Sequence, residues 1–213
     1  RRFGLTPALL SSLGRDAAGD ELIAACDRMG IATGYLYRSI DLPTDRYMAI
    51  EGANGLIAAI ADAHSLEAAG DRILRPLADG RLGSADAPYT GLIAIDGNLT
   101  EALLSQIAVS PLFAAADLRI APASPGKAER LLPLLAHPGA TLYVNLEEAS
   151  LLCKDRFGTT TEATAALLAR GAARVLVTDG GNSTAEGQAG MGLICDTPPQ
   201  VMVTRVTGAG DTF

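Results

Sequence analysis

The chain has 213 residues, 48% of them hydrophobic, and a formal net charge of −7. This length and apolar content suit one globular domain with a large core, and no apolar run approaches the roughly 20 residues of a membrane span. The acidic balance, without any basic cluster, argues against nucleic acid as a partner. The three cysteines are widely spaced and no signal peptide opens the chain, so we expect reduced, buried thiols in a cytoplasmic protein at Cys26, Cys153 and Cys195.

The first part of the chain predicts a loop and a helix. Residues 14–20, which read Gly-Arg-Asp-Ala-Ala-Gly-Asp, are typical of a loop, and Asp20 is positioned to cap the helix that follows. Apolar side chains then recur at helical spacing until Gly30, which ends the pattern: Leu22, Ile23, Cys26 and Met29.

Residues of about 31–62 have the pattern of antiparallel β structure. Residues 46–51 and 56–61 are short strand candidates, and Asn54-Gly55 between them is a strong signal for a hairpin turn. The hairpin is either a surface ribbon or a lid over a site, and its composition does not separate the two interpretations.

From Leu92 onward, short apolar runs alternate with helical patterns. We expect strands at residues 92–96, 118–121, 141–144 and 174–178, and helices at about 100–109, 126–136, 147–153 and 162–170. This alternation predicts an α/β fold with a mostly parallel sheet covered by helices, and no linker divides the region.

Polar residues follow the ends of these predicted strands. Each of them alone is typical of a helix cap or a turn, but the carboxyl ends of parallel strands meet at one edge of a sheet, where ligands bind in open α/β folds. We therefore expect a ligand site at that edge, formed by residues 96–98, Ser124, residues 145–148 and residues 178–181.

The last stretch, Val206–Phe213, contains Gly208-Ala209-Gly210-Asp211. Successive backbone N–H groups in a glycine-rich turn form a concavity that binds anions, and an Asp beside it can accept a proton from an attacking hydroxyl. The alternative is a glycine-rich turn in which the Asp only caps a helix.

With this stretch placed beside Asn145-x-x-Glu148, the chain resembles the ribokinase-like, or phosphofructokinase-B, family of carbohydrate and nucleoside kinases. Gly14-x-Asp16-x-x-Gly19 and Val177-Thr178-Asp179-Gly180 agree with this resemblance. The resemblance implies a three-layer α/β fold with a mostly parallel central sheet and a small antiparallel β lid. Residues 1–213 then form a single domain, and both ends of the chain look incomplete by comparison with the family.

The resemblance also implies catalytic roles for the terminal stretch. Asp211 would take the proton from the acceptor hydroxyl, and Gly208, Ala209 and Gly210 would supply backbone N–H groups to the transferring phosphoryl group. The reaction would be an ATP-dependent phosphorylation of a sugar or nucleoside hydroxyl.

Four further residues would hold the nucleotide. Asn145 and Glu148 would organise Mg²⁺ through water beside the ATP phosphates, and Thr178 and Gly180 would line the nucleotide site. For Asn145 and Glu148 the alternative is a helix cap with an acidic residue in the first turn.

Within the family, several segments are most similar to pseudouridine kinases: residues 96–99, residues 121–128, residues 44–50 and Val206. This similarity implies that the acceptor is the 5′-hydroxyl of pseudouridine, and that four residues lie near the substrate or its lid: Asn98, Lys127, Thr44 and Tyr47. Each also has a purely structural interpretation as a helix cap, a solvated side chain or sheet packing.

Two positions depart from the family pattern. Ala121 stands where the pseudouridine kinases have Asp, and Arg205 stands where many members have Asp or Asn in a monovalent-cation site, so its guanidinium argues against potassium activation. The alternatives are a ribokinase-like sugar or purine-nucleoside kinase, and a catalytically silent nucleoside-binding protein of the same fold. Hairpins of this family can pair between subunits, so the resemblance is compatible with a homodimer, although the sequence does not determine the oligomeric state.

Overall fold

The computed structural model describes residues 4–52 and 55–200. The chain forms two compact units. We call the first the ribbon unit, which contains the described residues up to Ile73 together with Gln200, and the second the sheet unit, which contains Leu74–Pro199. Each unit is described by itself.

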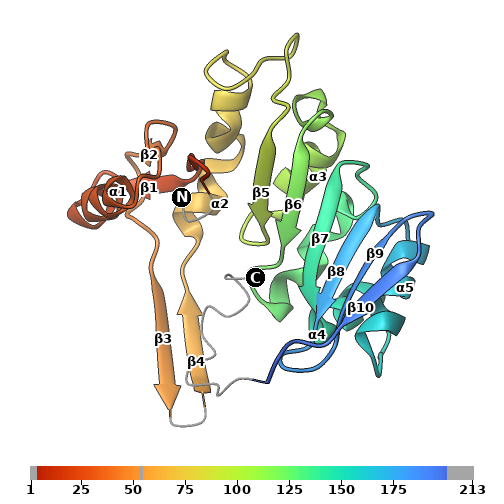
Figure 1. Cartoon of the computed structure of the whole chain (residues 1–213). Coiled ribbons are helices and arrows are strands. Elements are labelled where there is room, and N and C mark those ends of the chain that lie inside the picture. Colours follow the sequence, from red (N-terminus) through yellow and green to blue (C-terminus); the bar gives the residue numbers. More distant parts are fainter. Residues whose placement is uncertain (1–3, 53–54, 201–213) are drawn as a thin grey trace. The chain divides into compact units, whose positions relative to one another are not determined.

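The ribbon unit begins with a small β-α-β arrangement. Strand β1 (Ser12–Gly14) pairs in parallel with β2 (Tyr37–Ser39), and helix α1 (Ala17–Arg28) connects them (Figure 1). The helix starts earlier than predicted, because Asp16 and not Asp20 is its N-cap: the Asp16 carboxylate accepts the N–H of Gly19. The predicted cap at Asp20 is therefore wrong, and Asp20 lies inside the first turn.

An antiparallel ribbon follows in the same unit. Strands β3 (Tyr47–Gly52) and β4 (Gly55–Ala61) pair with Tyr47 opposite Ala61, which confirms the two predicted strands. Large apolar side chains are exposed along the ribbon, among them Met48, Ile57 and Ile60. Helix α2 (His64–Ala69) comes next, and the 3₁₀-helix η1 (Gly70–Leu77) continues the chain.

The sheet unit contains a six-stranded sheet in the order β10-β9-β8-β7-β6-β5. The parallel strands are β5 (Leu92–Asp96), β6 (Asp117–Ala121), β7 (Ala140–Asn145) and β8 (Arg174–Thr178), as the alternating pattern predicts. Two antiparallel strands extend the sheet beyond the prediction, β9 (Thr184–Gln188) and β10 (Leu193–Asp196).

Helices α3 (Glu101–Val109), α4 (Leu146–Cys153) and α5 (Thr160–Ala169) lie close to their predicted positions. The helix predicted at 126–136 is instead the 3₁₀-helix η3 (Pro125–Leu134), which contains Pro133. Proline has no N–H to donate and disfavours an α-helical interior, so the tighter 3₁₀ winding is physically reasonable there. A short 3₁₀ turn, η2 (Pro111–Phe113), follows α3.

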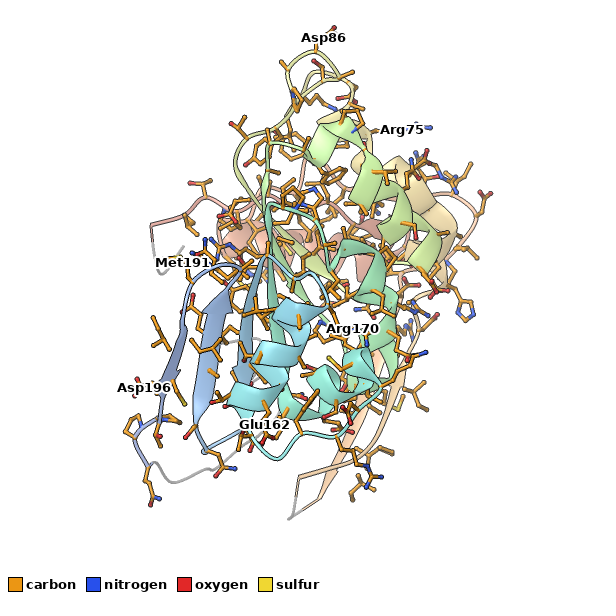
Figure 2. The ribbon with its side chains drawn as sticks, turned by 90° about the vertical axis from the view of Figure 1, so that its right-hand side faces the viewer. Arg75, Asp86, Glu162, Arg170, Met191 and Asp196 are labelled. Atoms are coloured by element: carbon orange, nitrogen blue, oxygen red, sulfur yellow. The ribbon has the colours of Figure 1, made fainter. Side chains whose placement is uncertain are left out.

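The core of the sheet unit lies between the sheet and these helices. In Figure 2, the helix side of this unit is turned toward the viewer. Alternate strand residues such as Leu118, Val144 and Val175 are buried, and they pack in the same core as the helix residues Leu104 and Leu167. Each such side chain contributes roughly 1.5–3 kcal/mol by leaving water. This core holds the strand ends in a fixed row.

The three cysteines differ in their environments. All have free thiols; Cys153 is buried and Cys26 is half-buried, but Cys195 is exposed, so the expectation of a buried thiol is wrong there. Cys195 lies on the edge strand β10, whose residues are all exposed. Across residues 4–52 and 55–200, no helix has both the length and the apolar character needed to span a membrane.

Candidate functional site

The polar strand ends of the sheet unit lie at one edge of the sheet. Asp96 at the end of β5 is in register with Ala121 on β6, and Asn145 at the end of β7 is in register with Thr178 on β8. The four arrowheads point toward the same edge in Figure 1. This arrangement confirms that the polar clusters found in the sequence share an edge, the edge at which open α/β sheets bind ligands.

Asn145 and Glu148 form a capping box at the start of α4. The N–H of Glu148 donates to Asn145 Oδ1 at 2.8 Å, and the N–H of Asn145 donates to Glu148 Oε2 at 2.9 Å. The helix-cap interpretation is therefore correct for both residues. The cap uses only one oxygen of the Glu148 carboxylate, because Glu148 Oε1 accepts no hydrogen bond from the described residues, so this side chain can also have another role.

The Glu148 carboxyl is in an unusual environment for an acid. Only 8% of the residue is exposed, and this burial raises the pKa of the carboxyl, while the hydrogen bond from the Asn145 N–H acts in the opposite direction. A nearby cation would favour the ionised form. A buried carboxylate with one uncommitted oxygen at a ligand-binding edge is therefore a candidate cation partner.

These residues fit Mg²⁺ held through water. Within the described part of the chain, no three His, Cys, Asp or Glu side chains gather into a cage for a metal. Mg²⁺ keeps several waters and needs few protein carboxylates, so one carboxylate oxygen with an amide beside it matches its usual mode of binding.

A second cluster joins the ends of β5 and β6. Lys127 Nζ donates to Asn98 Oδ1 at 2.7 Å, and the backbone N–H of Asn98 donates to Asp96 Oδ1 at 2.8 Å. Arg130 Nη1 also donates to the carbonyl oxygen of Asn98 at 3.3 Å. The structure thus brings together Asn98 and Lys127, both predicted from the sequence, and adds Asp96 and Arg130 as residues that orient them.

Gly97 allows the two loops of this cluster to approach each other. A Cβ atom at Gly97 would lie 3.0 Å from the Ala123 nitrogen and 3.2 Å from Pro122 Cα, which is closer than most real contacts of a Cβ atom. The absence of a side chain therefore lets the loop after β5 pack against the loop after β6.

Thr178 and Gly180 lie at the far end of the row. Thr178 faces Asn145 across the strand pair, and Gly180 has a positive φ of 55°, a conformation that glycine adopts without strain. Asn182 closes the turn by donating its N–H to the carbonyl oxygen of Asp179 at 2.8 Å. Gly180 and the next residue, Gly181, are both exposed, so a ligand can approach the backbone at this turn without meeting a side chain.

Thr44 and Tyr47 belong to the ribbon unit. Thr44 is 3% exposed, and its hydroxyl donates to Asp16 Oδ1 at 2.5 Å and accepts the N–H of Gly14 at 3.1 Å. Tyr47 begins β3 and is 62% exposed. The remaining predicted residues, Gly208, Ala209, Gly210 and Asp211, lie outside the described residues, as does Arg205.

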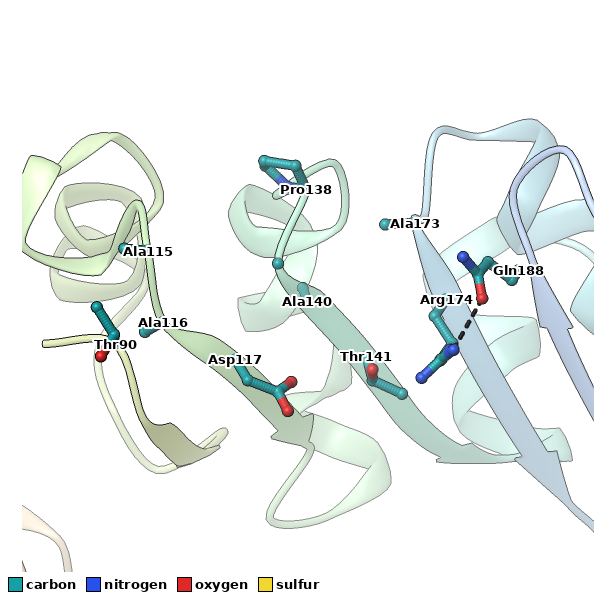
Figure 3. Close-up of a pocket in the computed structure, with 11 residues that line it drawn as sticks. Thr90, Ala115, Ala116, Asp117, Pro138, Ala140, Thr141, Ala173, Arg174 and Gln188 are labelled. Carbon is teal, nitrogen blue, oxygen red and sulfur yellow. Dashed lines mark hydrogen bonds between the residues drawn. The ribbon is translucent and has the colours of Figure 1, made fainter.

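A hollow of about 340 Å³ lies at the opposite, amino-terminal edge of the sheet (Figure 3). Its polar lining includes Asp117, Thr141 and Arg174, and Arg174 Nη2 donates to Gln188 Oε1 at 2.8 Å. None of the polar strand ends lines this hollow. It is therefore separate from the candidate site.

The chain matches the model of the pfkB family carbohydrate kinases over residues 1–213. The chain belongs to this family. A comparison with curated proteins found no match.

Solved structures agree with the family assignment. A carbohydrate kinase from Agrobacterium tumefaciens has a TM-score of 0.76 at 24% identity, covering 98% of this chain and 64% of its own. Ribokinase from Thermotoga maritima has a TM-score of 0.71 at 20% sequence identity, and the match covers 96% of this chain and 64% of the ribokinase. Ribokinase from Arabidopsis thaliana, complexed with ribose and ATP, has a TM-score of 0.72 at 21% identity, and the match covers 97% of this chain and 66% of the ribokinase.

These similarities confirm the expected fold of the pfkB-family chain: a ribokinase-like α/β arrangement with a mostly parallel sheet and a small antiparallel one. The chain spans 64% of the length of the Agrobacterium and Thermotoga proteins. The choice of pseudouridine as acceptor stays a prediction.

Proposed function

We propose that this protein transfers the terminal phosphoryl group of ATP to a hydroxyl of a sugar or nucleoside, with the 5′-hydroxyl of pseudouridine as first choice. The main support is the row of strand ends in a pfkB-family chain: the Asn145–Glu148 pair stands beside Thr178, and the Asn98–Lys127 pair lies at the same edge. The similar Arabidopsis ribokinase is described as a complex with ribose and ATP, which suits one nucleotide and one sugar at this edge.

The proposed reaction assigns each step to residues of this chain. Asp211 accepts the proton of the acceptor hydroxyl, whose oxygen then forms a bond to the γ-phosphorus while the bond to the bridging oxygen of ATP breaks and ADP leaves. The backbone N–H groups of Gly208, Ala209 and Gly210 stabilise the charge on the transferring group. These four assignments rest on the sequence.

Asn145 and Glu148 would hold Mg²⁺ and its waters, and the ion would neutralise charge on the ATP phosphates. Glu148 Oε1, which accepts no hydrogen bond from the residues that the structure describes, is the group in position to accept a hydrogen bond from such a water. Thr178 and Gly180 would border the nucleotide on the neighbouring strand. Arg205 stands at the position where many family members have Asp or Asn in a monovalent-cation site, and its positive charge would repel such an ion, so we propose activity without added potassium.

Pseudouridine is favoured by the similarity of residues 96–99, 121–128 and 44–50 to pseudouridine kinases, and two of these segments meet in the cluster at the end of β5. Lys127 and Asn98 are hydrogen-bonded to each other and offer both donors and acceptors, as ribose hydroxyls require. Tyr47 on the ribbon is the further substrate candidate. The second choice is a ribokinase-like sugar or purine-nucleoside kinase, and a silent nucleoside-binding protein is the non-catalytic alternative.

The ribbon also supports a homodimer. Its exposed apolar residues would be covered by the ribbon of a second copy, and Ile57 and Ile60 are 72% and 67% exposed. An ATP-dependent reaction and three free thiols support a cytoplasmic location.

An acceptor panel tests the proposed function. The intact protein is assayed for phosphate transfer from ATP to pseudouridine, uridine, inosine, ribose and fructose, with and without potassium. We expect pseudouridine to give the highest kcat/KM, and Asp211→Asn to lower kcat by at least about a hundredfold while ATP still binds. Ligand-dependent thermal stabilisation without turnover on any acceptor would instead support the silent binding protein.

A further inference from the structure

The loop after β1 carries Gly14-x-Asp16-x-x-Gly19, a motif to which the proposed chemistry gives no role. All three of its named residues surround Thr44. Asp16 Oδ1 accepts the Thr44 hydroxyl at 2.5 Å, Asp16 Oδ2 accepts the Thr44 N–H at 2.9 Å, and the Gly14 N–H donates to Thr44 Oγ1 at 3.1 Å. Asp16 also accepts the N–H of Gly19 at 2.9 Å.

The two glycines leave the space that Thr44 occupies. A Cβ atom at Gly14 would lie 2.5 Å from the Thr44 nitrogen, and one at Gly19 would lie 2.8 Å from Thr44 Oγ1 and 2.5 Å from the Gly14 carbonyl oxygen. Real Cβ atoms essentially never come so close to backbone atoms. The spacing of the motif therefore forms a socket, defined by Gly14, Asp16 and Gly19, with Thr44 inside it.

Thr44 stands at the root of the ribbon. The next residue, Asp45, accepts the N–H groups of Ser65 and Leu66 at 2.8 and 3.0 Å, so it caps the helix α2 that follows the second strand. Asp62 N donates to the carbonyl oxygen of Arg46 at 2.8 Å and closes the base of the hairpin. Both ends of the ribbon are thus tied to the same small region.

A second buried contact joins this region to β1. The hydroxyls of Ser12 and Ser65 are 2.8 Å apart, and the two residues are 3% and 1% exposed. The ribbon itself is a two-stranded hairpin with exposed apolar side chains such as Met48, Ile57 and Ile60, and isolated two-stranded hairpins are only marginally stable. The direction of the ribbon therefore depends on its root.

We propose that the Gly14-Asp16-Gly19 socket anchors the ribbon through Thr44, and that Asp16 and Thr44 are positioning residues that hold the ribbon, with the substrate candidate Tyr47, for acceptor binding. The anchoring stands on the contacts within the ribbon unit. Its effect on catalysis rests on the proposed function. Thr44 then acts through the ribbon and does not touch the substrate.

The experiment compares three variants of the intact protein. Thr44→Val removes the hydroxyl while keeping the shape, Thr44→Ser keeps the hydroxyl, and Thr33→Val is a matched control because Thr33 Oγ1 donates to another carboxylate of this unit, Asp27, at 2.8 Å. Hydrogen exchange of the ribbon amides and separate KM values for acceptor and ATP are measured for each.

We expect Thr44→Val to speed exchange in β3 and β4 by about tenfold or more, and to raise the KM for the acceptor by a similar factor. Thr44→Ser and Thr33→Val should stay within about twofold of the parent, and the KM for ATP should not change. If Thr44→Val unfolds the protein, Asp16→Asn gives the same comparison with the cap of α1 retained.

Unchanged exchange in the ribbon of a folded Thr44→Val or Asp16→Asn protein would overturn the anchoring. Faster exchange with an unchanged acceptor KM in an active enzyme would overturn the positioning role. If the parent transfers phosphate to no acceptor, the proposed function fails, and the exchange data still decide whether the socket anchors the ribbon.

Discussion

Asn145 and Glu148 form reciprocal hydrogen bonds at the start of α4. The Asn145 side chain accepts the Glu148 N–H at 2.8 Å, and the Glu148 carboxylate accepts the Asn145 N–H at 2.9 Å. The pair uses one carboxylate oxygen for the helix and leaves the other uncommitted among the described residues. Glu148 therefore combines an observed helix-capping role with the proposed magnesium role, and a substitution can separate the two.

Glu148→Gln is the substitution that makes this separation. Glutamine retains an oxygen that can accept the Asn145 N–H, so we expect the free energy of unfolding in urea to change by less than about 1 kcal/mol. Because the charge is lost, kcat at fixed Mg²⁺ should fall by about 10- to 100-fold. Glu147→Gln, on the exposed neighbour, is the control and should leave kcat within about twofold. Equal activity of the two variants would remove Glu148 from the magnesium site.

Asn98 and Lys127 should act as one unit on the acceptor. We expect Asn98→Ala and Lys127→Met each to raise the acceptor KM by about tenfold, and the double variant to raise it little further, because the two side chains share a hydrogen bond. Lys154→Met is the control, since Lys154 pairs with Glu129 at 3.6 Å and its side chain is 70% exposed. Additive effects of the two substitutions on KM would show that the pair does not work together.

The sequence predicts the strands β5 to β8 because each is a short apolar run between turn signals. It does not predict β9, which reads Thr-Ala-Glu-Gly-Gln and carries little strand propensity of its own. That strand forms because β8 and β10 pair with it on both sides. Neighbouring strands thus supply information that a single segment lacks.

The prediction of site residues from sequence is limited in the same way, because it uses only local patterns. The capping box of Asn145 and Glu148 spans four residues, so local spacing is enough to predict it, whereas the magnesium role proposed for the pair rests on the family resemblance. Thr44 is correctly placed beside the hairpin by its sequence, but its partner Asp16 is 28 residues away, and no periodicity links them. The fold is needed to show that the Thr44 hydroxyl is already occupied.

The substitution Gly19→Ala has two opposing effects on stability: it raises helix propensity, and it introduces a steric clash. Alanine is favoured over glycine inside a helix by about 1 kcal/mol, but its Cβ atom would lie 2.5 Å from the Gly14 carbonyl oxygen. The clash involves backbone, so we expect a net loss of about 1–3 kcal/mol in the free energy of unfolding. Gly34→Ala is the control, because nothing lies within 4 Å of a Cβ atom at that glycine, and we expect a change within about 1 kcal/mol. If urea unfolding gave similar changes in the free energy of unfolding for the two variants, the steric role of Gly19 in the socket would be wrong.

Asp16 should make stability depend on acid pH. The Thr44 hydroxyl, the Thr44 N–H and the Gly19 N–H all donate to its carboxylate and lower its pKa from 3.8 to about 2. Because the folded state holds the proton less tightly than the unfolded chain, the stabilising contribution is complete above pH 3.8 and is lost as the pH falls toward 2. We therefore expect the stability difference between the parent and Asp16→Asn to shrink across that window. Urea midpoints of both proteins from pH 6 to pH 2 measure it, and a difference that stays constant would show that the Asp16 charge does not stabilise the socket.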